Sequence, residues 1–91
     1  MNKRKDILDT ISANYIVGDK NAEVFLMEMY IHYIKLDLEI GGNLALVFKE
    51  LYMSDKKLSY DEISYKFSIG LTTLQRYRKR FNSLAEKMLL R

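Results

Sequence analysis

The chain has 91 residues, of which 48% are hydrophobic and 30% charged, and it carries a formal net charge of +3 at pH 7. A chain of this size and composition forms one small domain with a limited hydrophobic core. Without cysteine it has neither a disulfide framework nor a zinc–cysteine site, and the lack of proline with only four glycines favours an almost entirely helical fold.

The charge is distributed unevenly along the chain. Residues 1–55 hold six Lys or Arg and nine Asp or Glu, a sum of −3, whereas residues 56–91 hold nine and three, a sum of +6; together they give the net charge of +3. Such an asymmetry indicates that one part of the surface faces a polyanion.

The first predicted helix lies within residues 4–15 and ends before Gly18. Its apolar residues recur at helical spacing: Ile7, Leu8, Ile11 and Tyr15. The preceding Lys3, Arg4 and Lys5 form either a solvated terminus or a basic arm on phosphates. Because the start of the chain lacks the apolar region of a signal peptide, we expect a cytoplasmic protein.

Residues 21–40 are the most apolar part of the chain. Four polar residues form one narrow stripe: Glu28, His32, Lys35 and Glu39. A helix with so little polar surface must be covered on most sides, and it is too short and too interrupted by charge to span a membrane. We expect the central core helix, either buried entirely within its own chain or forming part of a homodimer surface. The alternation of polar and apolar residues from Lys35 to Ile40 leaves a strand there as an alternative. His32 has no potential co-ligands at suitable spacing and is expected on the surface.

Gly41 and Gly42 end this segment and divide the chain into an N-terminal helical part, residues 1–41, and a second part, residues 42–91. Asn43 can cap the next helix. That helix has one apolar face: Leu44, Val47, Phe48, Leu51 and Tyr52. It is the scaffold helix that a three-helix DNA-binding unit requires.

A further helix starts at Ser59. Ser59 and Glu62 have the spacing of a capping box, and Leu58 and Ile63 that of a hydrophobic staple. Residues 68–70, Ser-Ile-Gly, then allow a turn of three or four residues. Residues 58–90 therefore predict two helices separated by a sharp corner.

The last helix separates apolar from polar side chains. Its apolar residues fall within a sector about 80° wide, namely Leu74, Tyr77, Phe81, Leu84 and Met88. Opposite them lie Thr72, Gln75, Arg76, Lys79 and Ser83, with Arg78 and Arg80 at the flanks. Either Gly70 or Thr72 fits as the N-cap. We favour Gly70, because it places Thr72, Gln75 and Arg76 near the helix start, where a recognition helix enters the major groove.

The outward face of this helix has the chemistry that DNA recognition needs. Arg can bridge guanine O6 and N7, Gln can pair with adenine, and Lys can neutralise phosphate. The candidate base-reading residues are Thr72, Gln75 and Arg76. The candidate phosphate-binding residues are Thr73, Arg78, Lys79, Arg80 and Lys66.

Residues 67–76, Phe-Ser-Ile-Gly-Leu-Thr-Thr-Leu-Gln-Arg, are followed by the basic run 78–80. They resemble the pattern Leu-Gly-Ile-Ser-x-Ser-Thr-Val-x-Arg with trailing basic residues, which region 4 of bacterial sigma factors shares with small phage regulators of late transcription. Glu62-Ile63 stands where those families have Glu-Ile-Ala. The resemblance covers about the last half of the chain and departs from the pattern at Ser64, Ser68 and Gly70.

The sequence therefore predicts an all-α domain with a C-terminal helix-turn-helix that binds double-stranded DNA, as a bacterial or phage transcription regulator, and acts as a homodimer. One alternative is a small terminase-like DNA-packaging subunit, which would assemble as a ring. Another is a protein-interaction module in which residues 21–40 dock on RNA polymerase or a partner helix. The chain has no phosphate-binding glycine motif and no cysteine nucleophile, so we expect neither an enzyme nor a cofactor.

Overall fold

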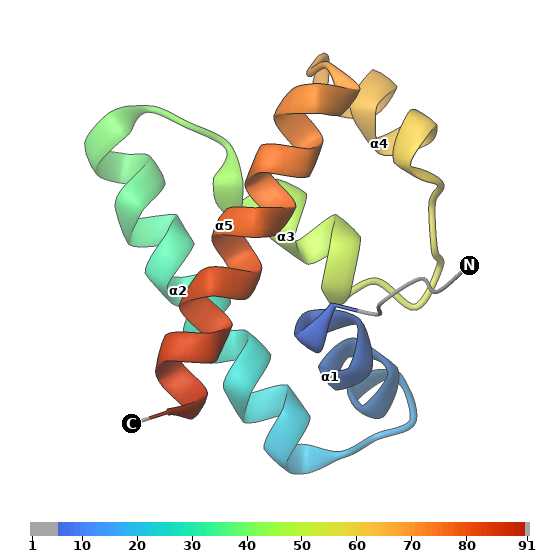
Figure 1. Ribbon diagram of the computed structural model, residues 1–91, viewed down its shortest axis with the longest axis vertical. Helices are drawn as coiled ribbons and strands as arrows, with labels where there is room; N and C mark the ends of the chain where they lie inside the picture. The colour runs from blue at the N-terminus through green and yellow to red at the C-terminus, as the bar shows by residue number, and fades with distance from the viewer. Residues whose placement is uncertain (1–5, 91) are drawn as a thin grey trace.

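The computed structural model describes residues 6–90, and within them it contains five α-helices and no strand (Figure 1). The helices are α1 (Ile7–Ile16), α2 (Lys20–Ile40), α3 (Leu44–Tyr52), α4 (Tyr60–Phe67) and α5 (Leu71–Leu89). The predicted all-α fold is confirmed, and the strand alternative for residues 35–40 is wrong because α2 continues through Ile40. The possible basic arm, Lys3, Arg4 and Lys5, lies outside the described residues.

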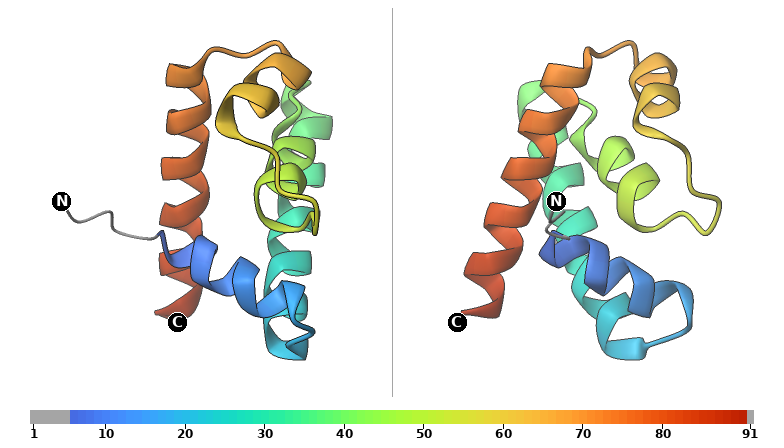
Figure 2. Two further views of the ribbon diagram at one scale, coloured as in Figure 1. Left: turned by 90° about the vertical axis from the view of Figure 1, so that its right-hand side faces the viewer. Right: turned by 45° about the vertical axis from the view of Figure 1, so that its right-hand side comes forward.

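The two longest helices, α2 and α5, lie on opposite sides of the molecule (Figure 2, left). Helix α2 packs against α1 and α3, whereas α5 packs against α1 and α4. No helix in the described part combines the length and apolarity that a membrane crossing requires.

All five helices contribute to one hydrophobic core, for example through Leu8, Leu26, Phe48, Ile63 and Phe81. Phe81 lies at the centre of its aromatic part: its ring centroid is 4.9 Å from that of Tyr33 and 5.2 Å from that of Phe48. Residues on both sides of Gly41 and Gly42 share this core, so the turn between them joins two parts that are packed together.

The local signals for the last two helices are confirmed. In the capping box, the Ser59 amide donates to Glu62 Oε1 at 2.9 Å, and the Glu62 amide donates to Ser59 Oγ at 3.1 Å. Hydrogen bonding to the Glu62 carboxylate, first by the Ser59 backbone amide and then by the Ser59 side chain, holds the pKa of Glu62 below its usual value. Gly70 is the N-cap of α5, as the favoured register predicted.

The N-terminus of α3 is capped differently from the prediction. Asn43 occupies the N-cap position, but its side chain makes no capping hydrogen bond. Instead, the carboxylate of Asp37 in the last turn of α2 accepts hydrogen bonds from the amides of Leu44 and Ala45, both at 2.9 Å. Gly41 adopts a left-handed conformation with φ of 74°, which reverses the chain and brings the start of α3 next to Asp37.

Helix α2 is only partly covered. One face is buried, through Ala22, Leu26, Met29 and Tyr33. Five apolar residues on its other side remain exposed: Val24, Met27, Ile31, Ile34 and Leu38. The expectation that the helices of one chain bury α2 entirely is therefore wrong for the described residues, because packing covers one of its two apolar faces.

Candidate nucleic-acid interface

Helix α5 is anchored by a buried face. Leu74, Phe81 and Ala85 are fully buried. The remaining residues of the predicted apolar sector are only half-buried: Tyr77, Leu84 and Met88. Ala85 was not assigned to this sector from the sequence. The buried face is consequently rotated toward the edge that carries Arg78, which faces α1.

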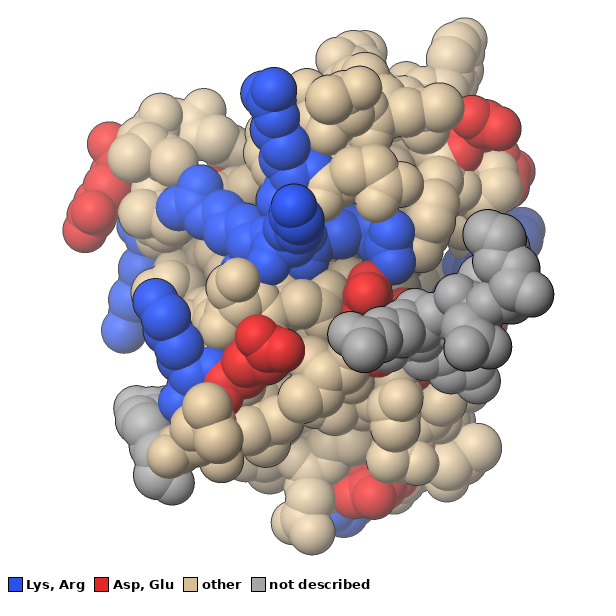
Figure 3. Space-filling model, in the orientation of Figure 1, with Lys and Arg blue, Asp and Glu red and all other residues tan. Residues whose placement is uncertain are grey.

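Five of the predicted DNA-contacting residues share the outward side of α5, all of them exposed: Thr72, Gln75, Arg76, Lys79 and Arg80. Within residues 6–90, the three basic members of this set take part in no ion pair. Figure 3 shows basic side chains gathered across the middle of α5 on the face turned to the viewer. Thr73, in the first turn, is half-buried. We call these five exposed residues the α5 face.

The turn that orients α5 is held by hydrogen bonds from α4. The Ser64 hydroxyl donates to the carbonyl of Ile69, and the Ile69 amide donates to the carbonyl of Ser64 at 3.0 Å. Ser68 adopts the left-handed conformation with φ of 54°, which glycine adopts more readily. Two positions at which the chain departs from the sigma-factor pattern are therefore involved in this turn: Ser68 lies in it, and Ser64 of α4 makes its hydrogen bonds.

Arg78 lies apart from the α5 face, although its sequence position suggested a phosphate contact. Its side chain is only 17% exposed, and its guanidinium forms an ion pair with Asp6 and lies 4.0 Å from Asp9. It also stacks over the ring of Tyr60, at 4.6 Å from the centroid, and donates to Gln75 Oε1 at 2.8 Å. Arg78 thus connects α5 to the start of α1.

Asn82, which the sequence did not single out, completes this connection. Its side-chain carbonyl accepts a hydrogen bond from the amide of Leu8 at 3.0 Å, near the start of α1. Its side-chain amide donates to the carbonyl of Arg78 at 2.8 Å and to the hydroxyl of Tyr52 at 3.3 Å. Burial raises the pKa of Tyr52 above its ordinary value, so this hydroxyl stays protonated.

Two other basic residues of the C-terminal part also make internal contacts. Lys66, a predicted phosphate ligand, forms an ion pair with Glu50 of α3. The Lys57 ammonium donates to Ser12 Oγ at 2.9 Å and to the carbonyl of Leu51 at 3.2 Å. Some of the basic residues in residues 56–91 therefore stabilise the fold through contacts within the chain.

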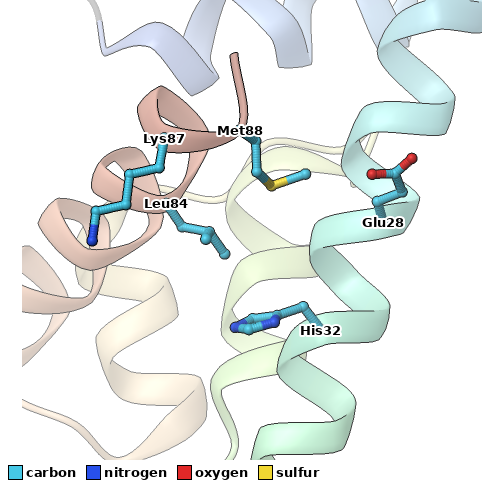
Figure 4. A pocket seen from close by; sticks show the side chains of 5 residues that line it. All are labelled: Glu28, His32, Leu84, Lys87 and Met88. Atoms are coloured by element: carbon cyan, nitrogen blue, oxygen red, sulfur yellow. The ribbon is translucent and has the colours of Figure 1, made fainter. Parts of the chain in front are cut away.

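An open hollow lies between α2 and the C-terminal half of α5. It is lined by Glu28, His32, Leu84, Lys87 and Met88 (Figure 4). His32 is exposed, as predicted. No group of three or more potential metal ligands occurs in the part of the chain that the structure describes.

The described residues form a small all-α protein in which a short turn at residues 68–70 joins α4 to α5, and the α5 face lies on the outward side of the second of these helices. Comparisons with protein-family models, with curated proteins and with solved structures found no match. The inferences that follow rest on the chain's own geometry and charge.

Proposed function

We propose that the protein binds double-stranded DNA through the α5 face. The observation that carries the proposal is the exposure of Arg76, Lys79 and Arg80 on one side of a helix whose opposite side packs on the core. On that opposite side Leu74 and Phe81 are completely buried. The buried side holds the helix in place, and the major groove is wide enough to admit an α-helix. Unpaired cations on such a helix favour a phosphate-rich partner.

The proposed roles follow from position along α5. Thr72, Gln75 and Arg76, in the first turns of the helix, contact base edges. Lys79 and Arg80, further along, hold phosphates. The contact from Arg78 orients the Gln75 amide and leaves its two N–H groups free to donate. Arg78 and Lys66 are omitted from the proposed phosphate contacts because both serve ion pairs.

We further propose that DNA binding serves regulation of transcription, in the cytoplasm of a bacterial cell and by a homodimer. The resemblance of residues 67–80 to sigma-factor region 4 and to phage late-transcription regulators supports this role, and it makes RNA polymerase a candidate second partner. Thr73, half-buried in the first turn of α5, would help to dock that turn on the DNA backbone.

Replacing Lys79 with alanine is expected to weaken binding to all duplexes about equally and to reduce the salt dependence of log K by about one. Fluorescence anisotropy with labelled random-sequence duplexes, at several salt concentrations, measures both effects. Lys20→Ala is the matched control, since Lys20 is equally charged but lies at the start of α2. No binding at low salt, or equal losses for the two variants, would contradict the proposal.

Replacing Arg76 with alanine is expected to affect specificity. On a preferred site selected from random duplexes, affinity should fall about tenfold, because the bidentate contact to one base pair is lost. On unrelated duplexes the loss should be no larger than that of Lys79→Ala. Repeating the selection with the variant should relax the preference at one position. An unchanged selected sequence would show that Arg76 reads no base.

A further inference from the structure

Five exposed apolar residues follow one another along α2 at alternating spacings of three and four. They are Val24, Met27, Ile31, Ile34 and Leu38, with exposed fractions of 58%, 40%, 45%, 37% and 82%. This spacing is the a and d pattern of a coiled coil, and at 100° per residue it lies opposite the buried Leu26, Met29 and Tyr33. We call the five exposed residues the α2 stripe.

The α2 stripe is suited to a protein partner. A row of exposed apolar side chains along one helix marks an interaction surface more often than a solvated one. A short isolated helix loses conformational entropy when it folds on binding a partner. Helix α2 is already folded, because the core holds it through Met29 and Tyr33, both essentially unexposed. Association on the α2 stripe therefore avoids most of that entropic cost.

We propose that the α2 stripe pairs with the same stripe of a second copy of this chain, antiparallel, about a two-fold axis that passes between residues 32 and 33. Ile31 then packs against the partner's Ile34, and Ile34 against the partner's Ile31. Met27 packs against the partner's Leu38, and Leu38 against the partner's Met27. These four pairs of residues form the four layers of the interface. The same stripe on each copy supplies all of them, as a self-complementary two-fold interface requires.

The charges beside the α2 stripe select this register. Glu28 and Lys35 flank the same edge of the stripe and are both exposed. In the proposed register, Glu28 lies beside the partner's Lys35 on both sides of the axis, which forms two ion pairs. A parallel pair would instead place Glu23 beside the partner's Glu28 twice. An antiparallel pair shifted by one heptad would place Glu28 beside the partner's Glu28. Like charges in those positions disfavour both alternatives.

The first test is the oligomeric state of the full chain without DNA, by sedimentation equilibrium. The wild type is expected to be a dimer, and Ile31→Glu a monomer with an unchanged circular dichroism spectrum, because Ile31 is exposed in the single chain. Leu46→Glu, at a 54% exposed apolar position on α3, is the matched control and should remain a dimer. A wild-type monomer, or a ring of eight or more subunits, would overturn the proposal.

The second test reads the register. Glu28→Lys and Lys35→Glu should each weaken dimerisation roughly tenfold, since each turns two attractive pairs into repulsive ones. The double variant Glu28→Lys/Lys35→Glu should restore the wild-type affinity. In a parallel pair, Glu28→Lys would instead strengthen dimerisation, because the new Lys would face the partner's Glu23. Both tests omit DNA, so failure of the DNA-binding proposal leaves them unaffected.

Discussion

Replacing Phe81 with alanine is expected to lower the free energy of unfolding by about 3–5 kcal/mol. Phe81 is completely buried, and its ring lies within 6.3 Å, centroid to centroid, of the rings of Tyr33, Phe48, Tyr52 and Tyr77. Removing it leaves a cavity bordered by these four rings. A chain of this length has a stability of roughly 5–14 kcal/mol, so this single change removes a large share of it.

Urea denaturation followed by circular dichroism measures this loss, and the melting temperature should fall by about 15 °C or more. Ser83→Ala is the matched control, because Ser83 is exposed on the same helix two residues away. Its effect should stay within about 0.5 kcal/mol. A loss below about 1 kcal/mol for Phe81→Ala would mean that the ring does not hold α5 on the core.

Replacing Arg78 with alanine is expected to lower the free energy of unfolding by about 2–3 kcal/mol, less than the full cost of breaking a buried pair because some solvent reaches both partners. The side chains of Arg78 and Asp6 are 17% and 29% exposed. Loss of the guanidinium leaves Asp6 and Asp9 as uncompensated neighbours and removes the stacking on Tyr60. The affinity for DNA should change much less than in Lys79→Ala.

A double-mutant cycle with Asp6→Asn measures the interaction energy between Arg78 and Asp6, which should exceed about 0.5 kcal/mol. Arg78→Lys keeps the charge but loses the planar fork, so it should recover only part of the stability. DNA affinity is compared at a temperature where every variant is folded. A stable Arg78→Ala protein that has lost its DNA affinity would return Arg78 to the phosphate-binding set.

The features that the sequence predicted correctly are local. The capping box of Ser59 and Glu62 and the N-cap at Gly70 involve groups within three or four residues, so their spacing largely determines their geometry. The roles of Arg78 and Lys66 depend on partners 72 and 16 residues away. The sequence near a basic residue does not indicate that a distant carboxylate will reach it. Arg78 and Lys66 were therefore predicted to bind phosphate.

Helix α2 shows a second limit of sequence reasoning. Its periodicity contains two apolar faces, one with Leu26 and Tyr33 and one with Ile31 and Leu38. Both faces satisfy the pattern of a buried helix side. Only the packing of the other helices decides that the first face enters the core and the second remains exposed. The cap that Asp37 provides for α3 depends on the same packing, because the reversal at Gly41 brings the two helices together.

The placement of α2 and α5 on opposite sides of the molecule affects how a dimer could use DNA (Figure 2). The rings of Tyr33 and Phe81 meet between these helices, so the α2 stripe and the α5 face point away from each other. Two copies joined through the α2 stripe would turn their basic faces outward and could not lie side by side in successive major grooves of one duplex. They would instead clamp two separate duplexes, or two distant segments of one duplex closed into a loop.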